Sequence, residues 1–211
     1  MKGKLKLISG KRIESPLNQK TRPTSSKVRE AIINIIGNKL EESSWLDLCS
    51  GSGAMACEAL QKGVKRILAI EKQRETAKTC KRNLIEVSNT VDHSIHVQVI
   101  CNELISFLKK GPKNKTIGFT KDSPSPDTKF DFVFLDPPYE SGLYELSQEL
   151  LLSKQWIKKS TILICECSSK SMPRIHNGWK LNKEKFYGNT SLLFLIPNQA
   201  LNCFDDTDSM H

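Results

Sequence analysis

The sequence has no apolar run that approaches 18 residues, and no hydrophobic segment follows its basic first residues. We therefore expect a cytoplasmic protein that neither spans a membrane nor is secreted. The seven cysteines include no C-x-x-C pair, and most of them stand within apolar runs. This pattern excludes a zinc-binding or disulfide-linked scaffold, so we expect reduced thiols and no bound metal.

Acidic residues are scarce near the N-terminus. Residues 1–40 contain ten Lys and Arg against two acids, Glu14 and Glu30, so they carry +8 of the net charge of +9. An even spread would indicate solubility alone, whereas this concentration favours a polyanion partner such as RNA or DNA. The alternative is a solvated charged face that binds nothing.

The 211 residues, 38% of them hydrophobic, suffice for one domain with a sizeable core and an extension. We expect a basic N-terminal extension over residues 1–40, formed by a short hairpin and a helix, with the main domain over 41–197. Residues 198–211 contain three aspartates and predict a disordered acidic tail. We expect a monomer.

From residue 45 onward, apolar segments alternate with amphipathic ones, which predicts an α/β fold with a mostly parallel sheet. We predict strands at 46–49, 67–70, 95–101, 130–135 and 161–165, and helices at 54–62, 74–87, 103–109 and 143–152. Residues 111–129 predict a surface loop. The segments 179–186 and 191–196, joined by Tyr187-Gly188-Asn189, predict a closing antiparallel hairpin.

A glycine turn follows the first predicted strand of the main domain, in the sequence Asp47-Leu48-Cys49-Ser50-Gly51-Ser52-Gly53. Glycines allow a ligand to approach the backbone, and the following helix start offers free N–H groups, so the turn suits a nucleotide-like ligand. The spacing also fits a loose dinucleotide fingerprint. Asp47 favours another ligand, because a carboxylate suits an ammonium group and repels a diphosphate.

This turn resembles the first motif of class I S-adenosylmethionine-dependent methyltransferases, whose cofactor carries an amino-acid end. Ligands of parallel sheets bind at the carboxyl ends of the strands. Glu71 and Asn102 fall at two such ends; we expect Glu71 to bind the ribose hydroxyls and Asn102, beside Glu103, to lie near the adenine. The predicted cofactor-binding residues are Asp47, Cys49, Gly51, Gly53, Glu71, Asn102, Glu103 and Asp136.

A second motif, Asp136-Pro137-Pro138-Tyr139, follows the strand predicted at 130–135. It resembles the D-P-P-Y motif of methyltransferases that modify exocyclic amino groups of bases. Such an amino group is conjugated to its ring and is a poor nucleophile. The Asp136 carboxylate and the Pro137 carbonyl can accept its two N–H bonds, prolines fix the backbone, and Tyr139 offers a face for the base. We therefore predict these four residues to be catalytic.

Taken together, the chain resembles the bacterial 16S ribosomal RNA guanine-N2 methyltransferases of the RsmD type. The resemblance rests on both motifs and on four further segments: Ile8-Ser9-Gly10-Lys11, Arg22-Pro23-Thr24, Val28-Arg29-Glu30 and Glu184-Lys185 to Gly188. It implies S-adenosylmethionine as cofactor and 16S RNA, in an assembling 30S subunit, as substrate. It also implies RNA-phosphate contacts for Lys11, Arg12, Lys20, Arg22, Lys27 and Arg29, with the cofactor pocket as an alternative place for Arg22.

Three other functions remain open on the residues alone. A DNA adenine-N6 or cytosine-N4 methyltransferase uses the same four-residue motif, although this chain has no separate target-recognition segment. The glycine turn with Glu71 also fits a nicotinamide-dependent oxidoreductase. The basic N-terminus fits a non-catalytic RNA-binding assembly factor.

Overall fold

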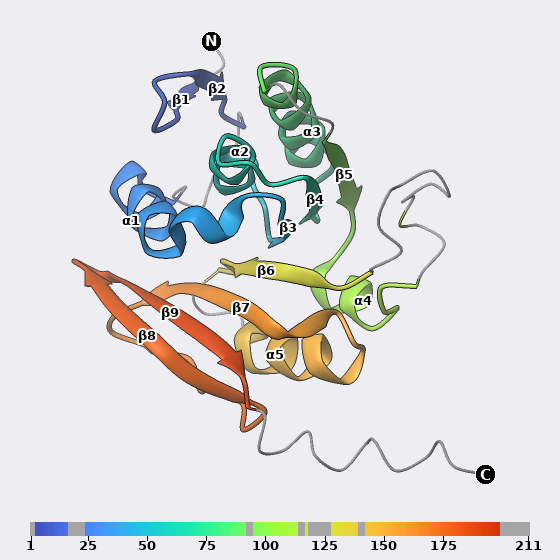
Figure 1. Ribbon diagram of the computed structural model, residues 1–211, viewed down its shortest axis with the longest axis vertical. Coiled ribbons are helices and arrows are strands. Elements are labelled where there is room, and N and C mark those ends of the chain that lie inside the picture. The colour runs from blue at the N-terminus through green and yellow to red at the C-terminus, as the bar shows by residue number, and fades with distance from the viewer. Residues whose placement is uncertain are drawn as a thin grey trace.

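The computed structural model describes residues 3–16, 24–91, 95–113, 117, 128–138 and 142–198. In chain order its elements are β1 (Lys4–Lys6), β2 (Arg12–Glu14), α1 (Ser26–Ile36), the 3-10 helix η1 (Gly37–Leu40), β3 (Ser44–Leu48), α2 (Ala54–Leu60), β4 (Arg66–Glu71), α3 (Arg74–Ser88), β5 (His96–Cys101), α4 (Leu104–Leu108), β6 (Phe130–Leu135), α5 (Leu143–Ser153), β7 (Ile157–Ser168), β8 (Trp179–Tyr187) and β9 (Thr190–Pro197) (Figure 1).

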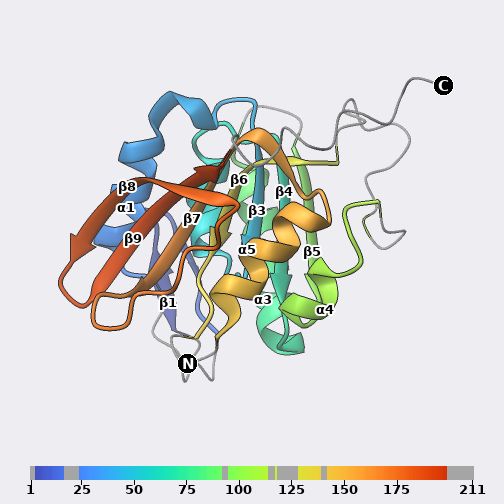
Figure 2. The same ribbon diagram turned by 90° about the horizontal axis from the view of Figure 1, so that it is seen from below.

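Within the described residues, seven strands form one sheet in the order β5-β4-β3-β6-β7-β9-β8. The first five strands in this order are parallel, whereas β9 is antiparallel to both β7 and β8. The helices α1, α2 and α3 cover one face, and α4 and α5 cover the other (Figure 2). The predicted α/β fold with a closing antiparallel hairpin is confirmed.

β3 shows why both faces of the sheet are covered. All five of its residues are buried, and its side chains alternate between two hydrophobic cores. Trp45 packs in the core beneath α1, α2 and α3, whereas Leu46 and Leu48 pack in the core beneath α4 and α5. The same alternation places Asp47 on the side of Trp45, under the glycine turn.

The strand order reverses between β3 and β6, and this reversal determines where a ligand can bind. From β3 the chain continues outward to β4 and β5, and it then returns to the other side of β3 with β6 and β7. The two sets of connections diverge at the carboxyl ends of β3 and β6, where they leave a crevice. Both sequence motifs follow these two strands.

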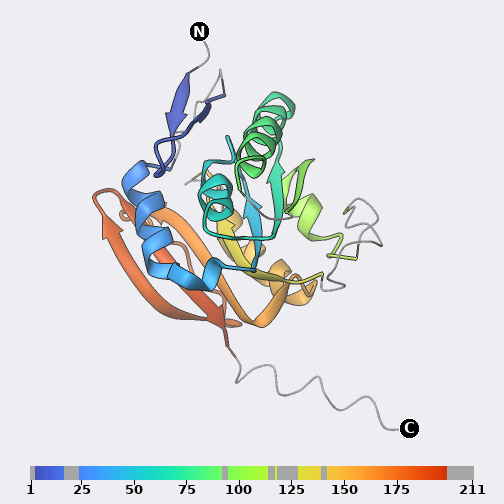
Figure 3. The same cartoon turned by 45° about the horizontal axis from the view of Figure 1, so that its top comes forward.

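The N-terminal hairpin β1–β2 lies beside α1 and α2 (Figure 3). Leu7 and Ile13 are buried in the same core as α1, so the hairpin packs on the main domain through apolar contacts. Ser25 caps α1 by accepting a hydrogen bond from the Val28 N–H at 3.3 Å. Thr24, just before this cap, donates a hydrogen bond to Asp136 at the carboxyl end of β6.

One predicted strand was too short. Residues 161–165 were expected to form it, but β7 extends from Ile157 to Ser168. The residues 158–160 are polar, so their composition does not predict a strand. Lys158 Nζ nevertheless lies 2.9 Å from Asp131 Oδ1, and the Lys158 N–H donates to Thr161 Oγ1. Most of the loop predicted at 111–129 and nearly all of the tail predicted at 198–211 lie outside the described residues.

Candidate active site

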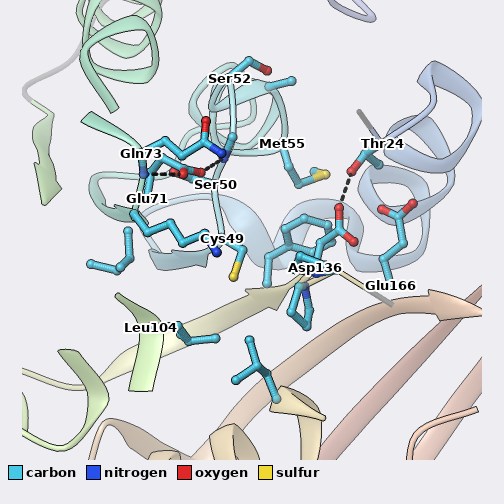
Figure 4. A pocket seen from close by; sticks show the side chains of 18 of the residues that line it. Thr24, Cys49, Ser50, Ser52, Met55, Glu71, Gln73, Leu104, Asp136 and Glu166 are labelled. Carbon is cyan, nitrogen blue, oxygen red and sulfur yellow. Dashed lines mark hydrogen bonds between the residues drawn. The ribbon is translucent and has the colours of Figure 1, made fainter. Parts of the chain in front are cut away.

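A cavity of about 890 Å³ opens at the crevice, above the carboxyl ends of β3, β4, β5 and β6 (Figure 4). Its wall consists mainly of the segments that follow these strands, namely residues 49–52, 71–73, 102–104 and 136–138. Thr24 and Ser25 before α1, Glu166 of β7 and the 187–190 turn close the remaining side. Segments far apart in the sequence thus share one site.

Most of the residues predicted from the two motifs line this cavity. They are Cys49, Gly51, Glu71, Asn102, Glu103, Asp136, Pro137 and Pro138. Asp47 and Gly53 do not line it, because Asp47 is buried beneath the turn and Gly53 caps the start of α2. Tyr139 lies outside the described residues.

Glu71 holds the glycine turn in place. Its Oε2 accepts a hydrogen bond from the Gly51 N–H at 3.0 Å, and its Oε1 accepts one from the Gln73 N–H at 2.8 Å. Each carboxylate oxygen retains a free lone pair for a ligand. Glu103 is also engaged, because its carboxylate caps α4 by accepting from the Ile105 and Ser106 N–H groups.

Gly53 is required by both its conformation and its neighbours. Its φ of 76° is left-handed, and a Cβ added there would lie 2.7 Å from Cys80 Sγ.

We predict that Gly53→Ala lowers the free energy of unfolding by ~2 to 4 kcal/mol, from strain and overpacking together. Gly142→Ala is the control, because Gly142 has a φ of 62° and no atom of the described residues lies within 4 Å of its Cβ position. This variant should cost only ~1 kcal/mol. Urea denaturation measures both, and equal costs would contradict the proposed clash.

Asp47 is a buried carboxyl group that lies beneath the glycine turn. It is 1% exposed, and among the described residues neither of its oxygens has a hydrogen-bond partner. Burial raises the pKa of Asp47 to about 8, reinforced by the nearby Glu71 carboxylate and opposed by the Ala56 backbone N–H and the Trp45 indole N–H. A positive charge in the cavity above the turn would favour the charged form of this carboxyl group, so the position favours a cationic ligand.

Asp136 shares one side of the cavity with Thr24 and Glu166 (Figure 4). The Thr24 hydroxyl donates a hydrogen bond to Asp136 Oδ2 at 3.3 Å. Burial, together with the Glu166 carboxylate, raises the pKa of Asp136 well above its usual value. Burial also raises the pKa of Glu166, against the opposing effects of the Thr24 hydroxyl and the Arg29 guanidinium.

Sequence reasoning missed Thr24 and Glu166 as parts of this cavity, together with the hydrophobic residues Leu104, Phe134 and Leu143 and the 187–190 turn. A signal for Glu166 was present, because it is the one acid within the apolar run Ile162-Leu163-Ile164-Cys165-Glu166-Cys167. No such signal marks Thr24, which reaches Asp136 across 112 positions of sequence.

The structure corrects the expectation that Arg29 contacts RNA phosphates. Arg29 is 2% exposed, and its guanidinium binds the Glu58 carboxylate and two backbone carbonyls. Arg12 and Lys27 are exposed, whereas Lys11 is partly buried and its Nζ donates to the Glu86 carbonyl oxygen at 3.0 Å. Lys20 and Arg22 lie outside the described residues.

Two further features of the described residues bear on function. None of their helices has the length and apolar character needed to cross a membrane. They contain no group of three or more His, Cys, Asp and Glu side chains with the arrangement of a metal site.

The sequence matches a known family model and known proteins over most of its length. The family model described as "Conserved hypothetical protein 95" matches residues 3–196. The "Ribosomal RNA small subunit methyltransferase D" of Buchnera aphidicola subsp. Baizongia pistaciae is 32% identical over 188 residues, which are 86% of each chain.

Solved structures share the fold. The yhhF protein of Escherichia coli superposes with a TM-score of 0.73 and 24% identity over 93% of this chain and 99% of its own. An RNA methyltransferase from Salinibacter ruber, in complex with S-adenosyl-L-homocysteine, gives a TM-score of 0.57 at 14% identity and covers 84% of this chain and 95% of its own.

Proposed function

This chain belongs to the conserved hypothetical protein 95 family, the RsmD-type family, and on that premise we propose that it transfers a methyl group from S-adenosylmethionine to the exocyclic N2 amino group of a guanine in 16S ribosomal RNA. One observation carries the proposal. The Asp136-Pro137-Pro138 segment and the glycine turn after β3 line the same cavity, at the reversal of strand order.

The residues of the cavity fit this cofactor. The Glu71 carboxylate can accept hydrogen bonds from the two ribose hydroxyls, and the Gly51 backbone allows a close approach. Asp47, beneath the turn and outside the cavity wall, would favour the ammonium of the amino-acid end through its charge and not by direct contact. Asn102 and Leu104, on the far wall, would contact the adenine. When bound, S-adenosylmethionine supplies an electrophilic methyl group on a sulfonium sulfur.

Asp136 and Pro137 would hold the target amino group. A carboxyl oxygen of Asp136 and the Pro137 carbonyl each accept one N–H bond, which directs the nitrogen lone pair toward the methyl group. As the nitrogen gains the methyl group it acquires positive charge and becomes acidic, and Asp136 is placed to stabilise that charge and to receive the proton. Positioning supplies the rest of the acceleration, because the reaction needs no nucleophilic side chain. Pro138 fixes the turn, and we keep Tyr139 as the proposed stacking partner of the base.

Residues 1–40 would form the RNA-binding extension of a methyltransferase domain at 41–197. Arg12 and Lys27 are its exposed basic residues among those expected to bind RNA, and Lys27 lies in the first turn of α1, close to Thr24 and Ser25 of the cavity wall. We extend the proposal to a cytoplasmic monomer that acts, without a metal, on an assembling 30S subunit.

A charge-removal experiment tests this RNA surface. In Arg12→Gln/Lys27→Gln we expect weaker RNA binding, and the slope of log affinity against log salt should fall by about two, because each phosphate contact contributes about one counterion. Lys109→Gln/Lys110→Gln, at the end of α4 on the other face of the sheet, removes the same charge and should leave the slope unchanged. Equal slopes for the two variants would place the RNA elsewhere.

The function itself is tested with small ribosomal subunits from cells that lack the gene. Incubation with S-adenosylmethionine that carries a labelled methyl group should label the RNA, and mass spectrometry of nuclease fragments should find N2-methylguanine at one position. Duplex DNA serves as the competing substrate for an adenine-N6 or cytosine-N4 methyltransferase. Calorimetry with NADH tests the alternative of a nicotinamide-dependent oxidoreductase. If neither RNA nor DNA were labelled, the remaining alternative would be a non-catalytic RNA-binding assembly factor.

A further inference from the structure

Glu166 is a buried carboxylate with no structural purpose visible in the fold. It is 4% exposed, in the apolar part of strand β7, and among the described residues its Oε2 has no hydrogen-bond partner. The backbone carbonyl of Glu166 accepts a hydrogen bond from the Tyr144 hydroxyl, so the backbone is held independently of the carboxylate.

Glu58 shows how this protein satisfies a buried glutamate that serves the fold. Glu58 is 2% exposed, and its carboxylate binds the Arg29 guanidinium at 3.0 Å and accepts from the Ile8 N–H at 3.0 and 3.2 Å. A glutamate that is similarly buried, with one carboxylate oxygen left unpaired, costs stability. Such a cost is typical of positions whose partner is a ligand.

The carboxylate of Glu166 lies in the wall of the cavity, on the same side as Asp136 (Figure 4). The Thr24 hydroxyl, which donates to Asp136, also favours the charged form of Glu166, as does the Arg29 guanidinium. Two acceptors therefore face the place where the amino group of the target base would sit.

The bases differ in the atom next to the amino group. In adenine and cytosine the amino group is flanked by a ring nitrogen that accepts hydrogen bonds, namely N1 and N3. In guanine the N2 amino group is flanked by N1–H, which is a donor. A segment such as Asp136-Pro137-Pro138 can hold any of the three amino groups, but a second carboxylate beside it is satisfied by guanine alone.

We propose that Glu166 selects guanine by accepting the N1–H in a hydrogen bond to its carboxylate, while Asp136 accepts from the neighbouring amino group. This specificity role rests on the proposed function and extends it. An adenine or cytosine in the same position would face Glu166 with a lone pair, which leaves the carboxylate buried and unpaired.

The test compares guanine with 2-aminopurine, which carries the same amino group but has an accepting N1. Small subunits are reconstituted with RNA that contains either base at the position found by mass spectrometry, and kcat/KM for methyl transfer is measured. The wild-type enzyme should prefer guanine by ~10²-fold, because the analogue loses a charged hydrogen bond.

Glu166→Gln should abolish or reverse this preference, because the glutamine amide can donate to the N1 of 2-aminopurine. Glu145→Gln, on the exposed side of α5, is the matched control and should keep the wild-type ratio. The thermal midpoint of Glu166→Gln should equal or exceed that of the wild type, whereas loss of a purely structural glutamate would lower it.

Two results would overturn the inference and leave the proposed function intact. One is equal methylation of both bases by the wild-type enzyme. This measurement does not depend on the folding of any variant. The other is an unchanged preference for guanine in Glu166→Gln. A wild-type enzyme that methylates neither substrate, nor native small subunits, would instead overturn the proposed function and the inference with it.

Discussion

Asp136→Ala is expected to lower the rate constant for methyl transfer by ~10²- to 10³-fold, the usual loss when one group that stabilises developing charge is removed. Asp136 follows β6, lines the cavity and is fixed by the Thr24 hydroxyl at 3.3 Å, and the two described residues after it, Pro137 and Pro138, have no side chain that could replace a carboxylate. Single-turnover labelling of small subunits measures the rate of transfer apart from product release. Turnover within a few-fold of the wild type would contradict the assigned role.

The same variant should remain folded, and its stability supplies a control. Burial and the facing carboxylates of Glu166 and Asp47 raise the pKa of Asp136, against the Thr24 hydroxyl. A raised folded-state pKa means that the stability contributed by the group is fully present below 3.8 and is lost as the pH rises through the folded-state value. Removal of Asp136 should therefore leave the thermal midpoint unchanged or higher at neutral pH, and the gain should grow with pH.

The sequence predicts most of this fold because the signals are local. A strand buried on both faces appears as an apolar run, and β6 was predicted at residues 130–135, where it lies. The prediction was incomplete where polar residues continue a strand, as at Lys158 of β7, because composition cannot show that a carboxylate such as Asp131 lies opposite. Long-range pairing supplies what the local pattern lacks.

The residues of the candidate active site also fall into those that the local sequence predicts and those that it does not. Residues at strand ends, such as Glu71 and Asp136, could be predicted because parallel strands bring their carboxyl ends to one edge. Asp47 was placed in the cofactor site, but the alternation of β3 directs it under the turn instead of into the cavity. Glu166 was missed because its neighbours on the strand are apolar, so its position indicated only a core.

Arg29 shows a signal that was present and misinterpreted. It was grouped with Lys27 as a basic residue of the extension, yet it begins a series with Ile32, Ile33 and Ile36 at the spacing of one helix face. All four residues are buried. A lone arginine on an apolar helix face predicts a buried ion pair, and its partner is the one acid of α2, Glu58.

Arg29→Met is accordingly expected to lower the free energy of unfolding by ~3 to 5 kcal/mol, because it leaves the Glu58 carboxylate buried without its charge partner. Arg29 Nε lies 3.0 Å from Glu58 Oε1, and the guanidinium also donates to the carbonyl oxygens of Thr24 and Lys6, each at 2.7 Å. The variant should therefore loosen Thr24, which positions Asp136, and slow methyl transfer even where the protein is folded.

A double-mutant cycle separates the ion pair from the packing around it. Arg29→Met/Glu58→Met should recover much of the lost stability, because two hydrophobic side chains of similar volume need no partner. Glu75→Gln breaks the exposed pair of Glu75 with Lys78, whose atoms lie 2.7 Å apart, and should leave the urea midpoint unchanged since water screens it. If Arg29→Met lowered the stability as little as Glu75→Gln, the pair would not be what joins the N-terminal hairpin, α1 and α2 beside the cavity.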